Sequence, residues 1–284
     1  MIQTSPRRLE PGDDEFPRVL RQIDPRVEQL WVIGHRLDEL GPPVAIIGAR
    51  GPTSYGLDVA QKLAGELASL GICVVSGMAR GIDAAAHEGA LAAGGKTIAV
   101  LGTGVDRPYP IVNRLLYRRI IEDGAVVSEQ PLGAQGYKSN FIARNRIIAA
   151  LSLGTILVQA RGERSGALTT INWCHQYGRE VLAVPGDIRS ELSVGPHQMI
   201  REGAALCANA ADVLEALAQR LEEAGMSRFG DLETRILKAL KERAVNPEGL
   251  ARALGEDPLT VDRALGRLEL AGAVVRDLGG YRKP

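Results

Sequence analysis

The sequence of 284 residues has no excess of either charge, because its 34 lysines and arginines equal its 34 aspartates and glutamates. A protein coated with positive charge is thereby excluded, and any site for a nucleic acid has to be a local basic patch. No apolar run approaches the ~20 residues that span a membrane. The N-terminal stretch carries charges from Arg7 to Glu15 and lacks the apolar core of a signal peptide. We therefore expect a cytoplasmic protein that makes no contact with a membrane.

The sequence is also poor in residues that form disulfides or bind metals. Its three cysteines, Cys73, Cys174 and Cys207, are odd in number and lie in apolar runs, which indicates buried thiols in a reducing compartment. Its four histidines show no spacing typical of a metal site. We expect neither a metal nor a cofactor.

Short apolar runs alternate with helical patterns through most of the chain. This order predicts an α/β fold, an extended Rossmann-like parallel sheet with helices on both faces. In such sheets ligands bind beyond the carboxyl ends of the strands, so loops that are distant in sequence meet at one rim. The predicted strands are Val44–Gly48, Ile72–Val75, Thr97–Leu101, Ala125–Ser128, Thr155–Val158 and Val181–Val184.

We expect three parts along the chain. Residues 1–40 form an N-terminal segment that is partly helical, and residues 41–225 form the Rossmann-like domain. After a short linker, residues 228–284 show three helical patterns and a hairpin around Leu278-Gly279-Gly280. Three helices and a hairpin in so short a segment predict a small winged-helix domain.

Three loops are typical of sites that bind phosphate. Each follows an apolar run and opens a helical pattern, so small residues let backbone N–H groups approach an anion, and the helix N-terminus adds positive potential. An arginine lies in each loop. Together they favour a ligand with several phosphates, which a polynucleotide fits better than a mononucleotide. The loops are Gly48–Gly51, Ser76–Gly81 and Arg164–Thr170.

These loops lack the signatures of enzymes that act on nucleotides. The first has no G-x-G-x-x-G fingerprint and no lysine followed by serine or threonine, as in a P-loop. No carboxylate occurs from Arg164 to Arg179, where an enzyme that cleaves a nucleotide would need an acid or a base. No nucleophile, base and orienting residue form a set. The sequence therefore favours a binding protein without catalytic residues.

A basic cluster interleaved with the aromatic residue Phe141 follows the second loop. The stretch from 135 to 165 holds five basic residues and one acid. This composition suits single-stranded nucleic acid, because cations follow the phosphates while a ring stacks on a base, which is worth ~1–3 kcal/mol per base. Phe141 is either that ring or the first core residue of its helix.

A single-stranded nucleic acid, DNA or RNA, is the ligand that these features favour. For Arg144 and Arg146 a structural role is the alternative, through pairing with Glu129 or Asp187. The residues predicted to contact the strand are Gly48, Arg50, Thr53, Ser54, Ser76, Gly77, Arg80, Gly81, Lys138, Phe141, Arg144, Asn145, Arg146, Arg164, Ser165, Gly166 and Thr169.

The same stretches carry the motifs of a known family. They are Ile47–Arg50 with Ser54-Tyr55-Gly56, Ser76–Asp83 with Ala86-His87, Thr97–Gly102, Tyr109-Pro110, Ser128-Glu129, Phe141–Ile148, Ser165-Gly166 and Val184–Gly186. In this order they resemble the DNA processing protein A (DprA/Smf) family. The sequence departs from that family at Ala49 and Gln159, where serine and glutamate are common.

The resemblance implies a function as well as a fold. It implies binding of single-stranded DNA without hydrolysis of nucleotide, with DNA contacts at the positions of Arg50, Lys138 and Phe141. It also implies a homodimer that protects incoming DNA in natural transformation and helps to load the RecA recombinase onto that DNA.

Two other functions fit parts of the sequence. Related Rossmann-like folds include phosphoribohydrolases, so a nucleotide-processing enzyme of that type is the main alternative. A repressor that reads duplex DNA with the winged helix is the other. Residues 228–284 hold 11 basic and 9 acidic residues, which is a modest surface for duplex DNA.

Overall fold

The computed structural model describes residues 3–162, 165–224, 231–240, 245–270, 272–277 and 279–283. Arg164, one of the predicted phosphate contacts, lies outside these residues. The chain divides into two compact units, Met1–Ala208 and Asn209–Pro284.

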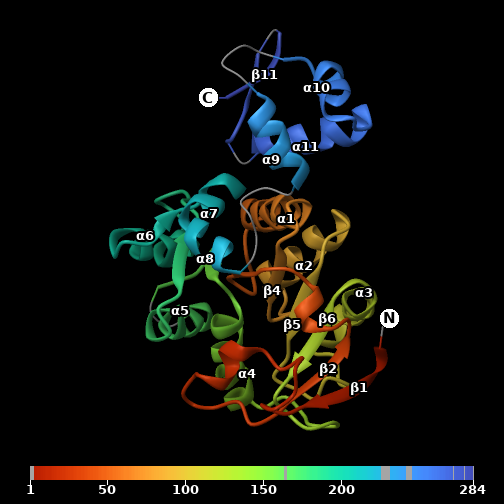
Figure 1. The fold of residues 1–284 in the computed structure, drawn as a ribbon. Coiled ribbons are helices and arrows are strands. Elements are labelled where there is room, and N and C mark those ends of the chain that lie inside the picture. Colours follow the sequence, from red (N-terminus) through yellow and green to blue (C-terminus); the bar gives the residue numbers. More distant parts are fainter. Residues whose placement is uncertain are drawn as a thin grey trace. The chain divides into compact units, whose positions relative to one another are not determined.

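In the first unit, nine strands of the described chain form one sheet in the order β1-β2-β6-β5-β4-β3-β7-β8-β9 (Figure 1). Neighbouring strands from β6 to β9 are parallel, while β2 lies antiparallel to β6 and β1 antiparallel to β2. The predicted Rossmann-like parallel sheet is confirmed. The strands are β1 Gln3–Leu9, β2 Leu30–Gly34, β3 Pro43–Ile47, β4 Cys73–Ser76, β5 Thr97–Val100, β6 Ala125–Ser128, β7 Gly154–Leu157, β8 Glu180–Ala183 and β9 Ala205–Leu206.

Helices cover both faces of the sheet, as predicted. On one face, Leu116 and Ile120 of α3 pack against Ala99 and Val126. The alternate residues of the same strands point to the other face, where they pack in one core with α4 and α5. The helices of this unit are α1 Ser54–Ser69, α2 Ile82–Ala92, α3 Arg114–Asp123, α4 Lys138–Leu151, α5 Gly166–Gln176 and α6 Val194–Arg201, with 3-10 turns η1 Arg18–Arg21, η2 Leu37–Glu39, η3 Ile111–Asn113 and η4 Glu191–Ser193.

The strand order reverses at β3. The chain adds β4, β5 and β6 on one side of β3, and then crosses through α4 to place β7, β8 and β9 on the other side. Loops that leave the two sides at such a switch point diverge and leave a crevice beyond the carboxyl ends of the strands. The loops after β3, β4, β5 and β7 all open toward this edge because these strands are parallel.

The N-terminal segment, which the sequence predicts to be partly helical, contains two strands and two short 3-10 turns. Its strands β1 and β2 extend the sheet past β6, and its only helical turns among the described residues are η1 and η2. The guanidinium of Arg7 on β1 donates to the buried Glu15 carboxylate and to the carbonyls of Gly34 and His35. Pairing with β6 satisfies the backbone of Leu30–Gly34, and only the fold reveals that this partner is available.

A buried histidine links α2 to the sheet. The hydroxyl of Thr97 donates to the Val74 carbonyl at 2.6 Å, so Thr97 accepts a hydrogen bond from Nδ1–H of His87, also at 2.6 Å. The other ring nitrogen, Nε2, is buried and has no partner among the described residues. Burial, together with the charge of Arg144, lowers the pKa of His87 to about 3.

Stability should therefore fall in acid because of His87. The unfolded chain takes up this proton near pH 6.5 and the folded protein does not, so the contribution is complete above pH 6.5 and is lost below it. Urea unfolding at pH 5 should show a loss of about 2 kcal/mol from this group relative to pH 7. His87→Asn keeps a donor toward Thr97 and should remove that loss. An equally steep loss in the variant would show that another group is responsible.

The second unit contains the predicted winged helix. Leu250, Leu265 and Tyr281 join one apolar core, and Asn246 caps α10 through the N–H of Gly249. Arg267 on α11 is paired with Glu233 on α9. The elements are α7 Ala210–Ala216, α8 Ala218–Glu223, α9 Asp231–Ala239, α10 Pro247–Leu254, α11 Pro258–Leu270, and an antiparallel hairpin of β10 Val275–Asp277 and β11 Gly280–Arg282.

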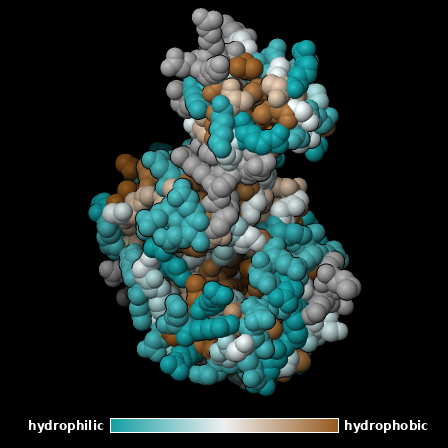
Figure 2. Space-filling model, in the orientation of Figure 1, coloured by the Kyte–Doolittle hydropathy of each residue, from teal (hydrophilic) through white to brown (hydrophobic). Residues whose placement is uncertain are grey.

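The surface is largely hydrophilic on the face that Figure 2 shows, and apolar residues appear in a hollow of the larger unit and in patches elsewhere on both units. The three predicted buried thiols are confirmed as free, buried cysteines. Within the described ranges, no helix has the length and apolar character needed to cross a bilayer.

Candidate nucleic-acid interface

Two adjoining cavities of about 520 and 750 Å³ lie at the carboxyl edge of the sheet. They share five lining residues, so they form one continuous groove, which we call the edge groove. The shared residues are Arg50, Ala79, Tyr109, Phe141 and Arg144. The groove therefore lies beyond the carboxyl ends of the strands, where the sequence predicts a ligand site, and at the point where the strand order reverses.

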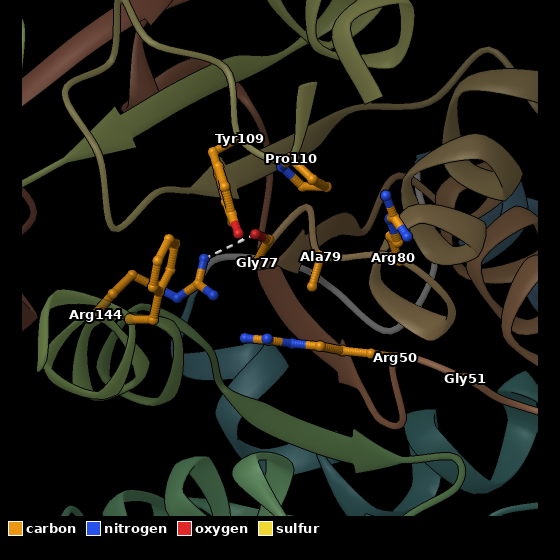
Figure 3. A pocket seen from close by; sticks show the side chains of 9 residues that line it. Arg50, Gly51, Gly77, Ala79, Arg80, Tyr109, Pro110 and Arg144 are labelled. Carbon is orange, nitrogen blue, oxygen red and sulfur yellow. Dashed lines mark hydrogen bonds between the residues drawn. The ribbon is translucent and has the colours of Figure 1, made fainter. Parts of the chain in front are cut away.

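Three exposed cations line the edge groove. Arg50 follows β3, Arg80 follows β4, and Lys138 is the first residue of α4. Within the described ranges, no carboxylate pairs with any of the three, and their side chains make no hydrogen bond. Figure 3 shows Arg50 extending across the cavity toward Arg144, whereas Arg80 lies on the side of Pro110. These charges are free to meet an anionic ligand.

Arg144 is a buried brace rather than a free cation. Its Nη1 donates to the Gly77 carbonyl at 2.8 Å and to the Val100 carbonyl, and the side chain is only 7% exposed (Figure 3). Burial lowers its pKa to about 10, Asp83 opposes this shift, and the charge of Arg50 adds to it. A Cβ at Gly77 would lie 2.6 Å from this guanidinium, so residue 77 has to be glycine for Arg144 to pack.

The loop after β4 is held in an unusual conformation. Met78 has φ of 56°, in the left-handed region that side chains rarely adopt. Asn113 donates to the Met78 carbonyl at 2.9 Å, and the N–H of Ala79 donates to the Asp83 carboxylate at 3.3 Å. Side chains from η3, α2 and α4 thus fix consecutive backbone groups at the wall of the groove. Such preorganisation lowers the entropic cost of binding.

The aromatic wall of the groove consists of Phe141 and Tyr109. Their ring centroids are 5.0 Å apart with an interplanar angle of 36°. A Cβ at Gly102 or at Gly136 would lie 2.7 or 2.6 Å from the Phe141 ring, so the ring packs closely on both glycines. Phe141 also lines both cavities. It therefore packs against the protein and also faces the groove, and its stacking on a base stays a prediction.

The structure brings eleven of the predicted contact residues to the edge groove. Most of them come from the loops after β3, β4 and β7 and from the first turns of α4 and α5. Their role as DNA contacts stays a prediction. These residues are Gly48, Arg50, Gly77, Arg80, Lys138, Phe141, Arg144, Asn145, Ser165, Gly166 and Thr169.

Two of the predicted contacts are corrected by the structure. Arg146 is buried, and its Nη2 donates to Glu129 at 2.6 Å and to the Arg26 carbonyl. The structural alternative, pairing with Glu129, is confirmed for this arginine. Ser76 is fully buried, and its hydroxyl donates to the Ile46 carbonyl at 2.6 Å, so it joins β4 to β3. Neither side chain lines the edge groove.

Three other predicted contacts lie beside the groove and not in its lining. Thr53 caps α1 by accepting from the N–H of Gly56, and Ser54 is the exposed first residue of that helix. Gly81 has φ of 82° and precedes α2. Gln159 stands where glutamate is common in the family. Its amide oxygen accepts a hydrogen bond from the Thr53 N–H, and its amide nitrogen donates one to the Thr53 hydroxyl, which accounts for glutamine at this position.

The predicted contacts did not include Tyr109 and Pro110, although both line the groove. Tyr109 and Pro110 follow β5 in a loop rich in glycine and proline, and Tyr109 is 49% exposed. The sequence did offer a signal for Tyr109, because it is an aromatic residue in a loop at the carboxyl edge of the predicted sheet. Asp83 also lines the groove, and burial raises its pKa while the charge of Arg144 lowers it.

The fold and the groove define the class of protein: a Rossmann-like α/β unit with a basic groove at its switch point, followed in sequence by a winged helix. The chain belongs to the DNA recombination-mediator protein A family, whose model matches residues 7–218. The DprA winged helix domain matches residues 228–280. The resemblance found in the sequence is thus confirmed.

Relatives match the chain over most of its length. DNA processing protein DprA of Streptococcus pneumoniae is 44% identical over 203 residues, which cover 71% of each protein. A putative DNA processing protein DprA of Mycobacterium tuberculosis is 36% identical over 294 residues, which cover 96% of this chain and 75% of the relative.

Two solved structures are similar in fold and in sequence. The X-ray structure of DNA processing protein A from Streptococcus pneumoniae has a TM-score of 0.70 at 41% identity and covers 74% of this chain and 73% of its own. The protein from Helicobacter pylori, described for its single-stranded DNA binding mode, has a TM-score of 0.68 at 29% identity and covers 78% and 99%.

Proposed function

We propose that this protein binds single-stranded DNA in the edge groove and catalyses no reaction there. The observation that carries the proposal is the lining of one continuous groove by three unpaired cations and two adjacent aromatic rings. Cations neutralise phosphates, and rings stack on unpaired bases whatever their sequence. The single-stranded DNA binding mode described for the Helicobacter pylori relative supports the same ligand class.

The geometry suggests how a strand lies in the groove. Phosphates meet Arg50, Arg80 and Lys138, while a base stacks on the Phe141 face beside Tyr109. The N-terminus of α5 adds positive potential for a further phosphate near Ser165. Contacts of this kind grip a flexible polyanion along its length and do not read its bases.

We propose that this binding takes place in the cytoplasm and serves natural transformation. The protein would protect incoming single strands and help to load RecA recombinase onto them, as family membership suggests. A homodimer is part of the proposal. The surface that would support it holds Ile188 and Val194, exposed by 88 and 45%, together with the half-buried Ile200.

One feature of the structure favours the alternative of a phosphoribohydrolase. It is the carboxyl group of Asp83, whose pKa is raised by burial. Asp83 is the only carboxylate among the described lining residues, and it already accepts a hydrogen bond from the loop N–H of Ala79. We therefore assign it to the loop and not to catalysis.

A binding comparison tests the proposal. Fluorescence anisotropy with single-stranded DNA, duplex DNA and single-stranded RNA of one sequence should show the tightest binding for single-stranded DNA. That affinity should fall linearly with salt on a double-logarithmic plot, because bound phosphates release counterions. Incubation with nucleoside monophosphates should release no base above a no-protein control. Preference for the duplex would indicate that the winged helix is the DNA-binding site. Release of base would support the alternative of a phosphoribohydrolase.

A further inference from the structure

An exposed apolar surface begins where the edge groove ends. Pro110 lines the groove, and the chain continues from it directly into η3 and α3. There Ile111, Val112 and Leu115 are 69, 62 and 68% exposed, although all three are aliphatic. Asn113, in the same segment, turns inward to the Met78 carbonyl. Large aliphatic side chains gathered on a surface indicate an interaction site.

Arginines surround these side chains. Arg118 and Arg119 lie three and four residues after Leu115, so they are its neighbours on the helix surface, and Arg114 opens the helix. All three are exposed, and within the described ranges they make no ion pair or side-chain hydrogen bond. Glu122 and Asp123, the acidic residues of the same helix, lie three to five residues after Arg118 and Arg119, and within the described ranges they form no ion pair with them. The α3 patch consists of Ile111, Val112, Arg114, Leu115, Arg118 and Arg119.

We propose that the α3 patch is a second subsite for single-stranded DNA, which receives the part of the strand that leaves the edge groove past Arg80 and Pro110. This proposal rests on the proposed function of the groove. Figure 3 shows Arg80 on the Pro110 side of the cavity, so a cation lies next to the junction. The strand would run from the aromatic wall to the aliphatic surface without a gap in lining residues.

Two properties of the patch favour a nucleic acid strand as its occupant. Unpaired arginines complement phosphates, which a strand presents at every nucleotide. Unstacked bases have apolar faces, and proteins contact such faces with isoleucine, leucine and proline as well as with aromatic rings. Continuity with the groove gives the strand an effective concentration at the patch that a separate protein partner does not have.

The length of the bound strand separates the patch from the groove. An oligonucleotide of about 6 nucleotides fills only the groove, whereas one of about 20 nucleotides reaches the patch, in keeping with site sizes of about 4–16 nucleotides for single-strand binding folds. Arg118→Gln combined with Arg119→Gln removes two phosphate contacts from the patch and none from the groove.

The experiment measures the affinity of the full chain for thymidine oligonucleotides of both lengths. The double variant should bind the long strand about fivefold more weakly, with a salt slope smaller by about 1.4, and should bind the short strand as the wild type does. Val112→Ser with Leu115→Ser should weaken only the long complex. Arg18→Gln with Arg21→Gln, two exposed arginines that line neither cavity, is the control for net charge.

The outcomes distinguish failure of the second subsite from failure of the proposed DNA binding in the edge groove. Wild-type affinity of both α3 variants for the long strand would overturn the second subsite and leave the patch to a protein partner. Equal weakening on short and long strands would overturn it as well, since the arginines would then act on the groove. A wild-type protein that binds neither strand would refute the proposed function itself.

Discussion

Arg50→Ala should lower the affinity for single-stranded DNA by about tenfold to a hundredfold, because a charge-assisted hydrogen bond is worth about 1.5–3 kcal/mol. Arg50 lines both cavities of the edge groove and has no partner of its own among the described residues. Its loss therefore leaves no buried carboxylate behind, and the fold should keep its stability. Anisotropy titration of a labelled oligonucleotide at fixed salt gives the affinity.

The matched control is another exposed arginine of the same unit. Arg8 is half exposed on β1, pairs with Glu10 at 3.0 Å and lines neither cavity. Arg8→Ala removes the same charge and should bind DNA like the wild type. If both variants bound equally well, the groove would not be the site. If both bound equally poorly, net charge and not position would explain the binding.

Arg144→Ala should destabilise the folded protein by about 3–5 kcal/mol, the cost of removing one partner from a buried charged cluster. The substitution leaves the carbonyls of Gly77 and Val100 without their donor and Asp83 without the cation that compensates its burial. Urea unfolding monitored by tryptophan fluorescence measures the loss.

Comparison with Asp83 separates the charge from the hydrogen bonds. Arg144→Ala combined with Asp83→Asn should recover part of the lost stability, because the uncompensated carboxylate is gone. The double variant should still unfold more easily than the wild type, because the carbonyl of Gly77 remains unsatisfied. A single variant as stable as the wild type would show that the brace contributes nothing to the fold.

The rim of loops could be predicted from the sequence because parallel strands place their carboxyl ends on one edge. That rule alone brings Arg50, Arg80 and Lys138 together, although up to 88 positions separate them in the sequence. Their exposure follows from their place in loops and at a helix start. The winged helix could be predicted for a different reason, because local periodicity and turn residues mark its helices and its hairpin.

The roles of Arg144 and Arg146 could not be read from the sequence. Both lie on one helix, and whether a guanidinium is buried depends on acceptors that the fold supplies from elsewhere, Gly77 and Glu129. Ser76 shows the same limit, because its hydroxyl faces β3 and not the loop that begins one residue later. Whether these three side chains are buried depends on partners that the tertiary structure supplies, and a local sequence pattern does not show such partners.

Two further features escaped sequence reasoning for lack of a regular period. Tyr109 stands in an irregular loop, so no helical or strand spacing marks it as a wall of the groove. Strand β1 has the polar sequence from Gln3 to Leu9, which lacks the alternation of a half-buried strand. Its place at the edge of the sheet requires little burial, which is why the pattern is weak.

The salt dependence of DNA binding tests the central claim most directly, because it counts phosphates held by the groove. The measurement compares the wild type with the triple variant Arg50→Ala, Arg80→Ala, Lys138→Ala on a strand of about 6 nucleotides. Each phosphate contact contributes about 0.7 to the slope of log affinity against log salt for single strands. The account predicts a slope smaller by about 2 in the triple variant. An unchanged slope would contradict it, since these cations would then not hold the strand.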